Sequence, residues 1–167
     1  MTSTLKLRQD PSPYLSELFN SEYPSSATFL VDTPTSVLPK KNRRYSVEDL
    51  DARANEIANA IQRLARKASP GDRIFLIKEN HFDVVVLAVA ISRAGFVPVV
   101  VSDSASDDDF QALVAKSNPN LVLVGGRFDS YTDNQIQALN MERPLLTVQE
   151  LAPLSDNKEI TLRDPHI

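Results

Sequence analysis

The chain has 167 residues, 42% of them apolar and 24% charged, a composition that is ordinary for one soluble globular domain with a hydrophobic core. Its net charge of −4 provides no basic field for nucleic acid, and the absence of cysteine excludes disulfides and thiolate metal sites. The start of the chain lacks the apolar core of a signal peptide, and the longest apolar run, Val84–Ile91, is too short to cross a bilayer. We therefore expect a cytoplasmic protein.

The N-terminal part of the sequence predicts a tail, a short helix and a hairpin. Residues 1–24 combine a polar tail with a helix that begins at Pro13 and runs through Phe19. The apolar side of this helix would consist of Tyr14, Leu15, Leu18 and Phe19. Thr28–Val31 is predicted to be a strand, and Arg43–Tyr45 is expected to pair back on it as the second arm of a hairpin.

A basic cluster lies in this predicted hairpin. Its members are Lys40, Lys41, Arg43 and Arg44. Such a cluster is compatible with a nuclear signal or a phosphate-binding patch. We favour a simpler interpretation, in which the charges are solvated at the tip of the hairpin.

The stretch that follows predicts an amphipathic helix over residues 46–69. Ser46 is a typical N-cap, and Asp49 three residues later makes a variant of the capping box. Apolar residues then recur at helical spacing, with acids in the first turn and bases in the last, which suits the helix dipole. Pro70-Gly71 is expected to end the helix.

Two short apolar runs flank a second predicted helix. Ile74–Ile77 and Val97–Val101 read as buried strands, and helix 81–94 between them makes them a parallel pair. Asn80 is the expected cap of this helix, and Gly95 is expected to end it in a left-handed conformation. The helix is apolar nearly all round, so it must be buried on several sides.

The remaining elements continue the alternation of strand and helix. Ser106 is predicted to cap a helix over residues 106–116, followed by strand Leu121–Val124, helix Asp133–Leu139 and strand Leu145–Val148. Asp107–Asp109 suggest a metal site at first sight. Because consecutive residues of a helix point in different directions, we interpret these acids as favoured by the helix dipole.

Together these elements predict an α/β fold: a mostly parallel sheet with helices on both faces, preceded by a short N-terminal β-hairpin. We assign residues 25–150 to this α/β subdomain and residues 151–167 to an irregular C-terminal segment. In such sheets ligands sit beyond the carboxyl ends of the strands. That edge would comprise Lys78–His81, Ser102–Ala105 and Gly125–Ser130.

The sequence contains little recognisable chemistry. His81 and His166 lie far apart without the spacing of a local metal motif, and His81 is expected to be a surface group. Gly125-Gly126 after a strand can approach a phosphate, but no P-loop lysine follows, and a plain turn is favoured. No nucleophile, base and orienting group can be assembled. We therefore predict no catalytic, cofactor-binding or metal-binding residue in this chain.

Three short motifs nevertheless resemble one family. Tyr45–Leu50 followed by Arg53–Asn55 resembles the opening of AMP-forming (adenylate-forming) ligases, which include acyl- and aryl-CoA synthetases and the adenylation domains of nonribosomal peptide synthetases. Pro70–Arg73 is similar to their P-G-D-R-V turn, and Ala90–Pro98 to their element leading from a helix into a strand. The resemblance extends over roughly residues 27–124.

The resemblance implies an enzyme that activates a carboxylic acid with ATP and Mg as an acyl-adenylate and passes the acyl group to the thiol of CoA or of a carrier protein. The family's phosphate loop and catalytic lysine are not found here, and the chain reaches Ile167 shortly before that loop would begin. Val99–Asp103 also departs from the family pattern. No catalytic residue is carried over, and we expect an N-terminal portion that is not catalytic by itself.

The expected partner is the remainder of the ligase polypeptide or a complementary chain. The apolar helix 81–94 would then leave an exposed apolar patch in the isolated chain, with the short helix around Tyr14–Phe19 as a small cover. Two alternatives stay open. One is a stand-alone α/β binding or protein-interaction module derived from the ligase scaffold, and the other is an unrelated doubly wound domain that binds a nucleotide or phosphoester at its strand ends. The sequence identifies neither the acyl substrate nor the acceptor.

Overall fold

The computed structural model of the chain describes residues 15, 18, 28–30, 37–38, 44–65, 67–79, 81–139 and 145–147. The first two strands, β1 (Thr28–Leu30) and β2 (Arg44–Ser46), pair antiparallel, which confirms the predicted hairpin. Of the residues in the basic cluster only Arg44 is described, and it is exposed.

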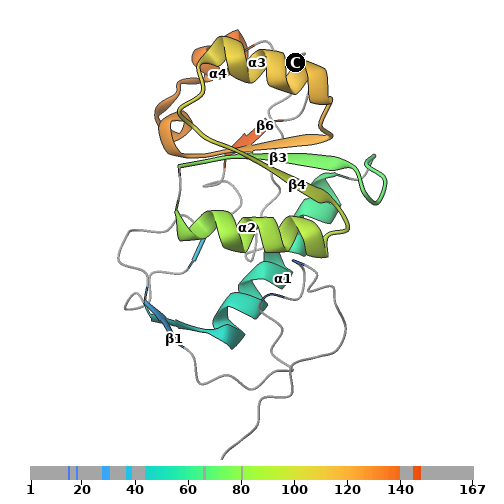
Figure 1. The fold of residues 1–167 in the computed structure, drawn as a ribbon, viewed down its shortest axis with the longest axis vertical. Coiled ribbons are helices and arrows are strands. Elements are labelled where there is room, and N and C mark those ends of the chain that lie inside the picture. The colour runs from blue at the N-terminus through green and yellow to red at the C-terminus, as the bar shows by residue number, and fades with distance from the viewer. Residues whose placement is uncertain are drawn as a thin grey trace, which may run out of the picture.

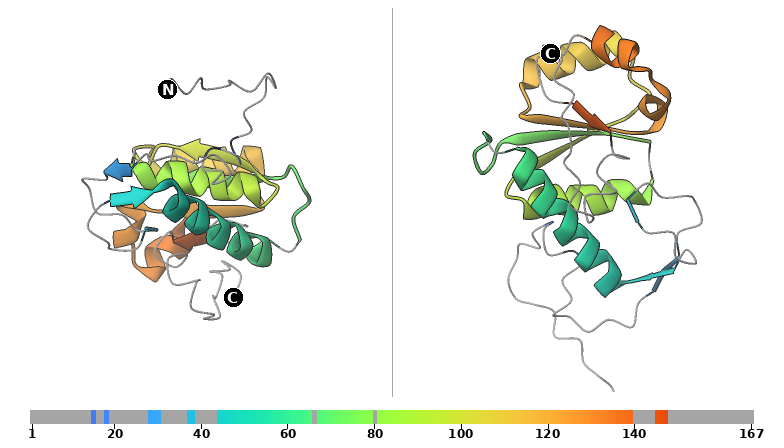
Figure 2. Two further views of the ribbon diagram at one scale, coloured as in Figure 1. Left: turned by 90° about the horizontal axis from the view of Figure 1, so that it is seen from below. Right: turned by 180° about the vertical axis from the view of Figure 1, so that it is seen from behind.

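The main sheet is parallel and has four strands in the order β4-β3-β5-β6 (Figure 1). The strands are β3 (Arg73–Ile77), β4 (Val97–Val101), β5 (Leu121–Val124) and β6 (Leu145–Thr147). Helices cover both faces of the sheet, as predicted (Figures 1 and 2). They are α1 (Val47–Leu64) and α2 (Phe82–Arg93) on one face, and α3 (Asp107–Ser117), the 3-10 helix η2 (Gly126–Ser130) and α4 (Asp133–Ala138) on the other.

The alternation of side chains along the inner strands divides the core into two layers. One layer joins Ile74, Leu76, Leu121 and Leu123 to α1 and α2. The other joins Phe75, Ile77, Val122 and Val124 to α3, η2 and α4. Because successive residues of a strand point to opposite faces, a strand that is apolar throughout serves both layers.

Helix α1 begins with the predicted capping box. The Asp49 N–H donates to Ser46 Oγ over 3.2 Å, and the Ser46 N–H donates to Asp49 Oδ2 over 2.9 Å. The helix ends at Leu64, whereas the sequence predicted that it would continue to residue 69. Pro70 disfavours helical backbone at the residue before it, and the Ser69 N–H donates to Asp72 Oδ2 over 2.7 Å instead of to a helical carbonyl.

Helix α2 is buried within the chain, so the predicted apolar patch on helix 81–94 is wrong for the described residues. Val86–Ile91 are all buried, and α1 packs against α2, lying beside it on the same face of the sheet (Figure 2). The described residues of the predicted N-terminal cover, Leu15 and Leu18, are themselves 40% and 55% exposed. Among the described residues, the other large apolar side chains that are exposed are Val97 and Val100.

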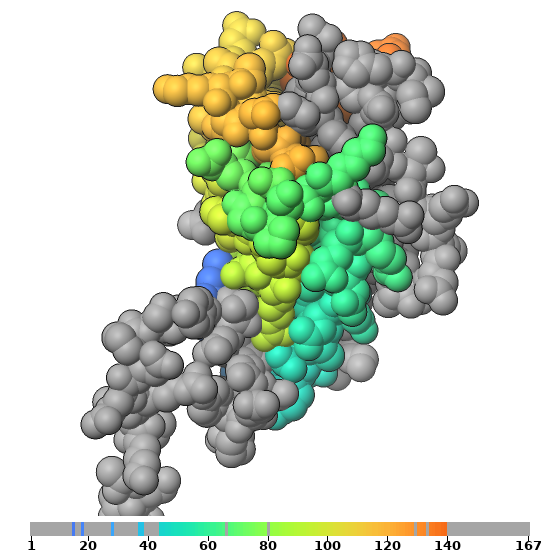
Figure 3. Space-filling model, turned by 90° about the vertical axis from the view of Figure 1, so that its right-hand side faces the viewer, coloured from blue at the N-terminus to red at the C-terminus, as the bar shows by residue number. Residues whose placement is uncertain are grey.

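The amino end of the sheet, which faces the viewer in Figure 3, is held together by hydrogen bonds between turn residues. The Gly71 N–H donates to the Gly95 carbonyl over 2.8 Å. Asp72 Oδ2 accepts from the Asn120 side-chain amide over 2.7 Å, in addition to its bond from Ser69. The motif that resembles a P-G-D-R turn therefore has a structural task here, which is to join the turns before β3, β4 and β5.

Gly95 has φ +92° and follows the end of α2, as predicted. We expect Gly95→Val to lower the free energy of unfolding by about 1–3 kcal/mol, because a β-branched residue tolerates positive φ poorly. Nothing lies within 4 Å of a Cβ at this position, so the cost would come from the backbone. Gly95→Asn is the matched control, since Asn adopts positive φ more readily and should cost less. Urea denaturation measures both, and equal midpoints for Val and Gly would contradict the prediction.

Candidate site at the carboxyl edge of the sheet

The strand order places a switch point between β3 and β5. The chain leaves β3 for β4 on one side and then returns to β5 on the other side. In doubly wound sheets this crevice beyond the strand ends is where ligands bind. The structure brings all three predicted loops together there, because a Cβ at Gly126 would lie against the carboxylates of Glu79, from the loop after β3, and of Asp103, from the loop Ser102–Ala105.

The loop after β3 contains a buried ammonium group. The Lys78 side chain is 2% exposed, and its Nζ lies 2.6 Å from Glu79 Oε1 and 3.9 Å from Asp83 Oδ2. Asp83 is fully buried in the first turn of α2. A charge taken out of water is tolerated when opposite charges surround it, so these carboxylates balance Lys78 inside the protein.

Glu79 is held in its ionised form by its surroundings. Partial burial of the carboxyl acts to raise its pKa. The hydrogen bond from Lys78, the bond from its own backbone N–H, and the positive charges of Lys78 and His81 outweigh this effect, so the pKa lies below its usual value. Glu79 therefore serves as a counter-charge rather than as a proton donor near neutral pH.

His81 is the N-cap of α2, which corrects two predictions. The sequence favoured Asn80 as the cap, a residue that lies outside the described part, and treated His81 as a surface group. In the structure, His81 Nδ1 accepts from the Asp83 N–H over 3.3 Å and lies 3.5 Å from Asp83 Oδ2, and the side chain is only 10% exposed. Imidazole is an uncommon cap, so the usual preference for Asn pointed to the wrong residue. His166 lies outside the described residues.

Gly126 begins η2 and lies close to two carboxylates in the crevice. Its φ is +64°, and a Cβ there would lie 2.6 Å from Asp103 Oδ2 and closer still to Glu79 Oε2. The turn at Gly125-Gly126 thus faces two carboxylates, a setting that repels phosphate. The structure supports the predicted interpretation of this pair as a turn and adds two reasons for glycine: the positive φ, and the Glu79 and Asp103 carboxylates that a Cβ would have to displace.

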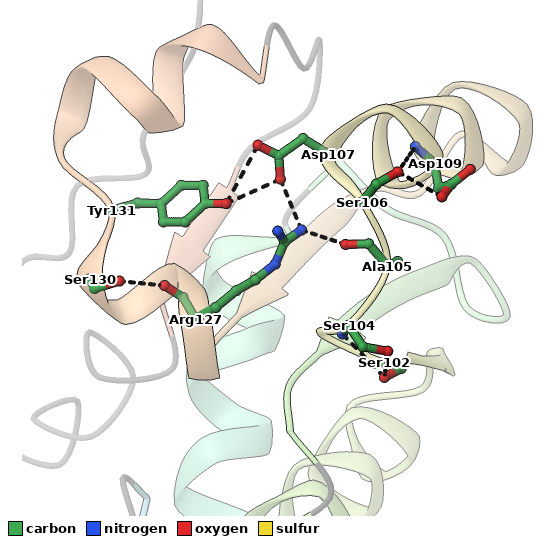
Figure 4. A network of polar contacts seen from close by, with 9 residues as sticks. All are labelled: Ser102, Ser104, Ala105, Ser106, Asp107, Asp109, Arg127, Ser130 and Tyr131. Atoms are coloured by element: carbon green, nitrogen blue, oxygen red, sulfur yellow. Dashed lines mark hydrogen bonds and ion pairs between the residues drawn. The ribbon is translucent and has the colours of Figure 1, made fainter.

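A polar clasp, formed by Arg127, Asp107, Tyr131 and the Ala105 carbonyl, fastens η2 to the start of α3 (Figure 4). Arg127 Nη2 donates to the Ala105 carbonyl over 2.6 Å and lies 2.9 Å from Asp107 Oδ1. The Tyr131 hydroxyl donates to the same carboxylate over 3.1 Å. The Arg127 guanidinium lies 4.6 Å from the centroid of the Phe128 ring, in cation–π geometry.

The electrostatics of the clasp favour the protonated phenol. Desolvation by burial, together with the hydrogen bond to Asp107 and its negative charge, raises the pKa of Tyr131 above its usual value, although Arg127 opposes the shift. Tyr131 therefore stays a donor to Asp107 throughout the physiological range.

The three consecutive acids of α3 have separate tasks. Asp107 belongs to the clasp, whereas Asp109 meets the N-cap: its N–H donates to Ser106 Oγ over 3.1 Å, and the Ser106 hydroxyl donates to its carboxylate over 2.6 Å. Among the residues that the structure describes, no group of three His, Cys, Asp or Glu side chains is placed to hold a metal. The predicted cap at Ser106 is confirmed.

The residues of the ligase-like opening also have structural partners. Arg53, which is buried, donates from Nε to the Val37 carbonyl over 2.5 Å and from Nη1 to Glu56 over 2.8 Å. Asn55 Oδ1 accepts from Arg93 Nη1 over 2.9 Å, which ties α1 to the end of α2. This motif therefore maintains the layer of helices on one face of the sheet.

Taken together, the carboxyl edge holds its charges in internal pairs, and within the described ranges no nucleophile, base and orienting group come together. Sequence reasoning missed the Lys78–Asp83 pair, whose only local signal is a lysine directly after a strand and an acid in the next helix. It also missed the clasp between Arg127 and Asp107, for which the sequence offers no local signal.

The fold and the three motifs define the N-terminal α/β subdomain of an adenylate-forming ligase. The family model for AMP-binding enzymes matches residues 18–165, and the chain belongs to this family.

Individual relatives are longer than this chain. It is 31% identical over 91 residues to 3-amino-2-hydroxy-4-methoxybenzoate diazotase of Streptomyces cremeus, a match that covers 53% of this chain and 16% of that protein. A benzoate CoA ligase from Burkholderia xenovorans LB400 has a similar structure, with a TM-score of 0.65, 24% identity and coverage of 86% of this chain and 28% of that one. The N-terminal subdomain of Klebsiella oxytoca NpsA gives a TM-score of 0.61 at 11% identity, covering 89% of this chain and 33% of that one. At these identities the structural matches show the fold alone.

Gly126 gives the sharpest test of the packing at this edge. We expect Gly126→Ala to be more destabilising than Gly95→Ala, by up to about 1 kcal/mol, because both positions have positive φ but only at Gly126 would a Cβ displace neighbouring groups, the carboxylates of Glu79 and Asp103. Chemical denaturation of both variants measures the difference. Equal losses would show that the carboxylates move aside at no cost and that the crevice is not closely packed.

Proposed function

We propose that this chain is the N-terminal portion of a ligase that activates a carboxylic acid with ATP as an acyl-adenylate and transfers it to the thiol of CoA or of a carrier protein. The match of the AMP-binding family over residues 18–165 carries this proposal. The chain spans only 16% of its curated relative and 28% of the benzoate CoA ligase, so the activity belongs to a longer polypeptide.

The residues described at the carboxyl edge do not fit ATP, and among them no three His, Cys, Asp or Glu side chains are placed to hold Mg. Two carboxylates flank Gly126, Lys78 is balanced by Glu79 and Asp83, and Arg127 is occupied by Asp107. A triphosphate would meet negative charge there instead of free donors. We therefore assign nucleotide and metal binding to other parts of the complete enzyme, and no catalytic, cofactor-binding or metal-binding role to this chain.

The proposed role of the chain is that of a scaffold. Residues 25–150 would form the α/β subdomain, and residues 1–24 and 151–167 would connect it to the rest of the enzyme. The partners would be the remaining ligase polypeptide or a complementary chain. Within the described part, no helix combines the length and apolar character needed to cross a membrane. We propose a cytoplasmic location for the complete enzyme.

One observation favours a second candidate, a stand-alone α/β binding or interaction module. Helix α2, which was expected to need cover from another polypeptide, is buried by the sheet and α1 within this chain. A fold that covers its most apolar helix has less need of a ligase body. The coding sequence beyond Ile167 separates the two candidates: an in-frame Ser/Thr/Gly-rich run ending in Pro-Lys supports the ligase portion, and a stop codon supports the module.

The proposal predicts that residues 1–167 alone catalyse no adenylate formation. ATP–pyrophosphate exchange measured with a panel of carboxylic acids should stay at the level of a control without enzyme. A complete ligase of the family, assayed in parallel, shows that the assay detects exchange. Exchange by the pure chain clearly above the control would contradict both the scaffold role and the assignment of ATP binding elsewhere.

A further inference from the structure

The start of α2 places a histidine beside a fully buried carboxylate. His81 Nδ1 accepts from the Asp83 N–H over 3.3 Å and lies 3.5 Å from Oδ2 of the same residue. The side chain of His81 is 10% exposed, and that of Asp83 is 0% exposed. One ring nitrogen therefore lies within reach of both a hydrogen-bond donor and a negatively charged acceptor.

The carboxylate beside His81 is compensated less closely than its neighbour. Lys78 Nζ lies 2.6 Å from Glu79 Oε1 but 3.9 Å from Asp83 Oδ2, which is too far for a hydrogen bond. Glu79 is 43% exposed, so water also solvates it, whereas Asp83 is shielded from solvent. The more deeply buried carboxylate thus has the more distant ammonium. A buried charge is stabilised by each opposite charge that reaches it, so Asp83 gains from a second cation.

The charged groups around His81 do not balance one another. Lys78 and Glu79 follow β3 and Asp83 lies in α2, so one ammonium faces two carboxylates. Asp103, from the loop after β4, brings a further carboxylate close to Glu79 in the crevice. Histidine is the side chain that ordinarily gains its charge between pH 5 and 8. Of the described groups here, His81 is therefore the one that can add a positive charge in this range.

Charges on the neighbouring elements are paired at other places. Asp51 of α1 lies 2.7 Å from Arg93, which is at the opposite end of α2. Arg127 of η2 contacts Asp107 and the Ala105 carbonyl. These pairs leave the local balance to Lys78 and the carboxylates close to it.

We propose that His81 is a proton-operated switch at the start of α2. When the ring is neutral, Nε2 carries its proton, and the Nδ1 lone pair accepts from the Asp83 N–H and caps the helix. When the ring takes up a proton from solvent, Nδ1 becomes a donor and can no longer accept. The cap bond is then lost, and the Nδ1–H donates to Asp83 Oδ2 in an ion pair with the buried carboxylate.

Each state gains one interaction and gives up another. In the neutral state, the Nδ1 lone pair lies 3.5 Å from a carboxylate oxygen, and this approach is repulsive. A proton on Nδ1 makes the same approach attractive, at the cost of the cap bond and of desolvating the imidazolium. Because this turn follows the loop that brings Glu79 into the crevice, the switch makes the carboxyl edge of the sheet respond to pH.

An NMR titration of residues 1–167 from pH 8 to pH 5 tests the proposal. The ring ¹⁵N shifts of His81 should show a proton on Nε2 and an acceptor at Nδ1 at pH 8. As the pH falls, Nδ1 should gain a proton, and the Asp83 amide signal should shift with the same midpoint. His81→Asn distinguishes this ring from that of His166. Asn caps helices without titrating, so the Asp83 amide of this variant should not change over the same range.

Three further variants test the charge argument. Asp83→Asn keeps the amide but removes the carboxylate, so the midpoint of His81 should fall by about half a pH unit or more. Glu79→Gln should lower the midpoint by less, because Glu79 is 43% exposed, and it leaves the fully buried Asp83 in place if Asp83→Asn does not fold. Asp108→Asn is the matched control, since Asp108 is an exposed acid of α3, and it should leave the midpoint unchanged.

Several results would overturn the proposal. They are a ring that stays neutral down to pH 5, a proton on Nδ1 at pH 8, and an Asp83 amide that does not follow the ring. A ¹³C shift that places the proton on the Asp83 carboxyl instead of the ring also contradicts it. So does a midpoint that neither Asp83→Asn nor Glu79→Gln lowers, or one that Asp108→Asn lowers equally. None of these results bears on the adenylation activity proposed above.

Discussion

The burial of α2 is the constraint on which the rest of the structure depends. A helix that is apolar on nearly every side cannot face water, and Val86–Ile91 are covered by the sheet and by the neighbouring α1. This requirement places α1 against α2, and the ion pair between Arg93 and Asp51, 2.7 Å long, fixes the contact near one end. Arg53 then draws the segment at Val37 against α1. The layer on this face is thus built outward from α2.

The two ends of the sheet are closed in different ways. At the amino end, hydrogen bonds of the turns around Asp72 and Gly95 join the starts of neighbouring strands. At the carboxyl end, charges close the crevice: Lys78 with its carboxylates on one side and Arg127 with Asp107 on the other. The position that commonly binds a ligand in doubly wound sheets is therefore filled by the protein itself. This filling of the crevice supports the scaffold role that we propose for the chain.

Local patterns predicted most of the fold. Ser46 with Asp49, the glycine after α2 and the short apolar runs each depend on neighbours within a few residues, so the sequence shows them directly. Contacts between segments that are distant in the sequence were harder to predict. The cover of α2 by α1 was missed because an apolar pattern shows that a face is buried but does not identify its partner.

The sequence predicted where the candidate site lies but not which side-chain interactions it contains. The three loops follow from the strand alternation, and they meet at Gly126. The pairing of Arg127 with Asp107 depends on where β5 lies relative to β4, which is a property of strand order and not of spacing along the chain. The role of His81 was missed because imidazole seldom caps a helix.

Native-state hydrogen exchange on residues 1–167 tests most directly whether α2 is the buried centre of a self-contained scaffold. If it is, the amides of Val86–Ile91 exchange only through global unfolding, with the same opening free energy as those of β3. The result that would contradict this is a lower opening free energy for α2 than for β3. Such a result would mean that α1 does not cover α2 firmly in the isolated chain and that another polypeptide is needed to do so.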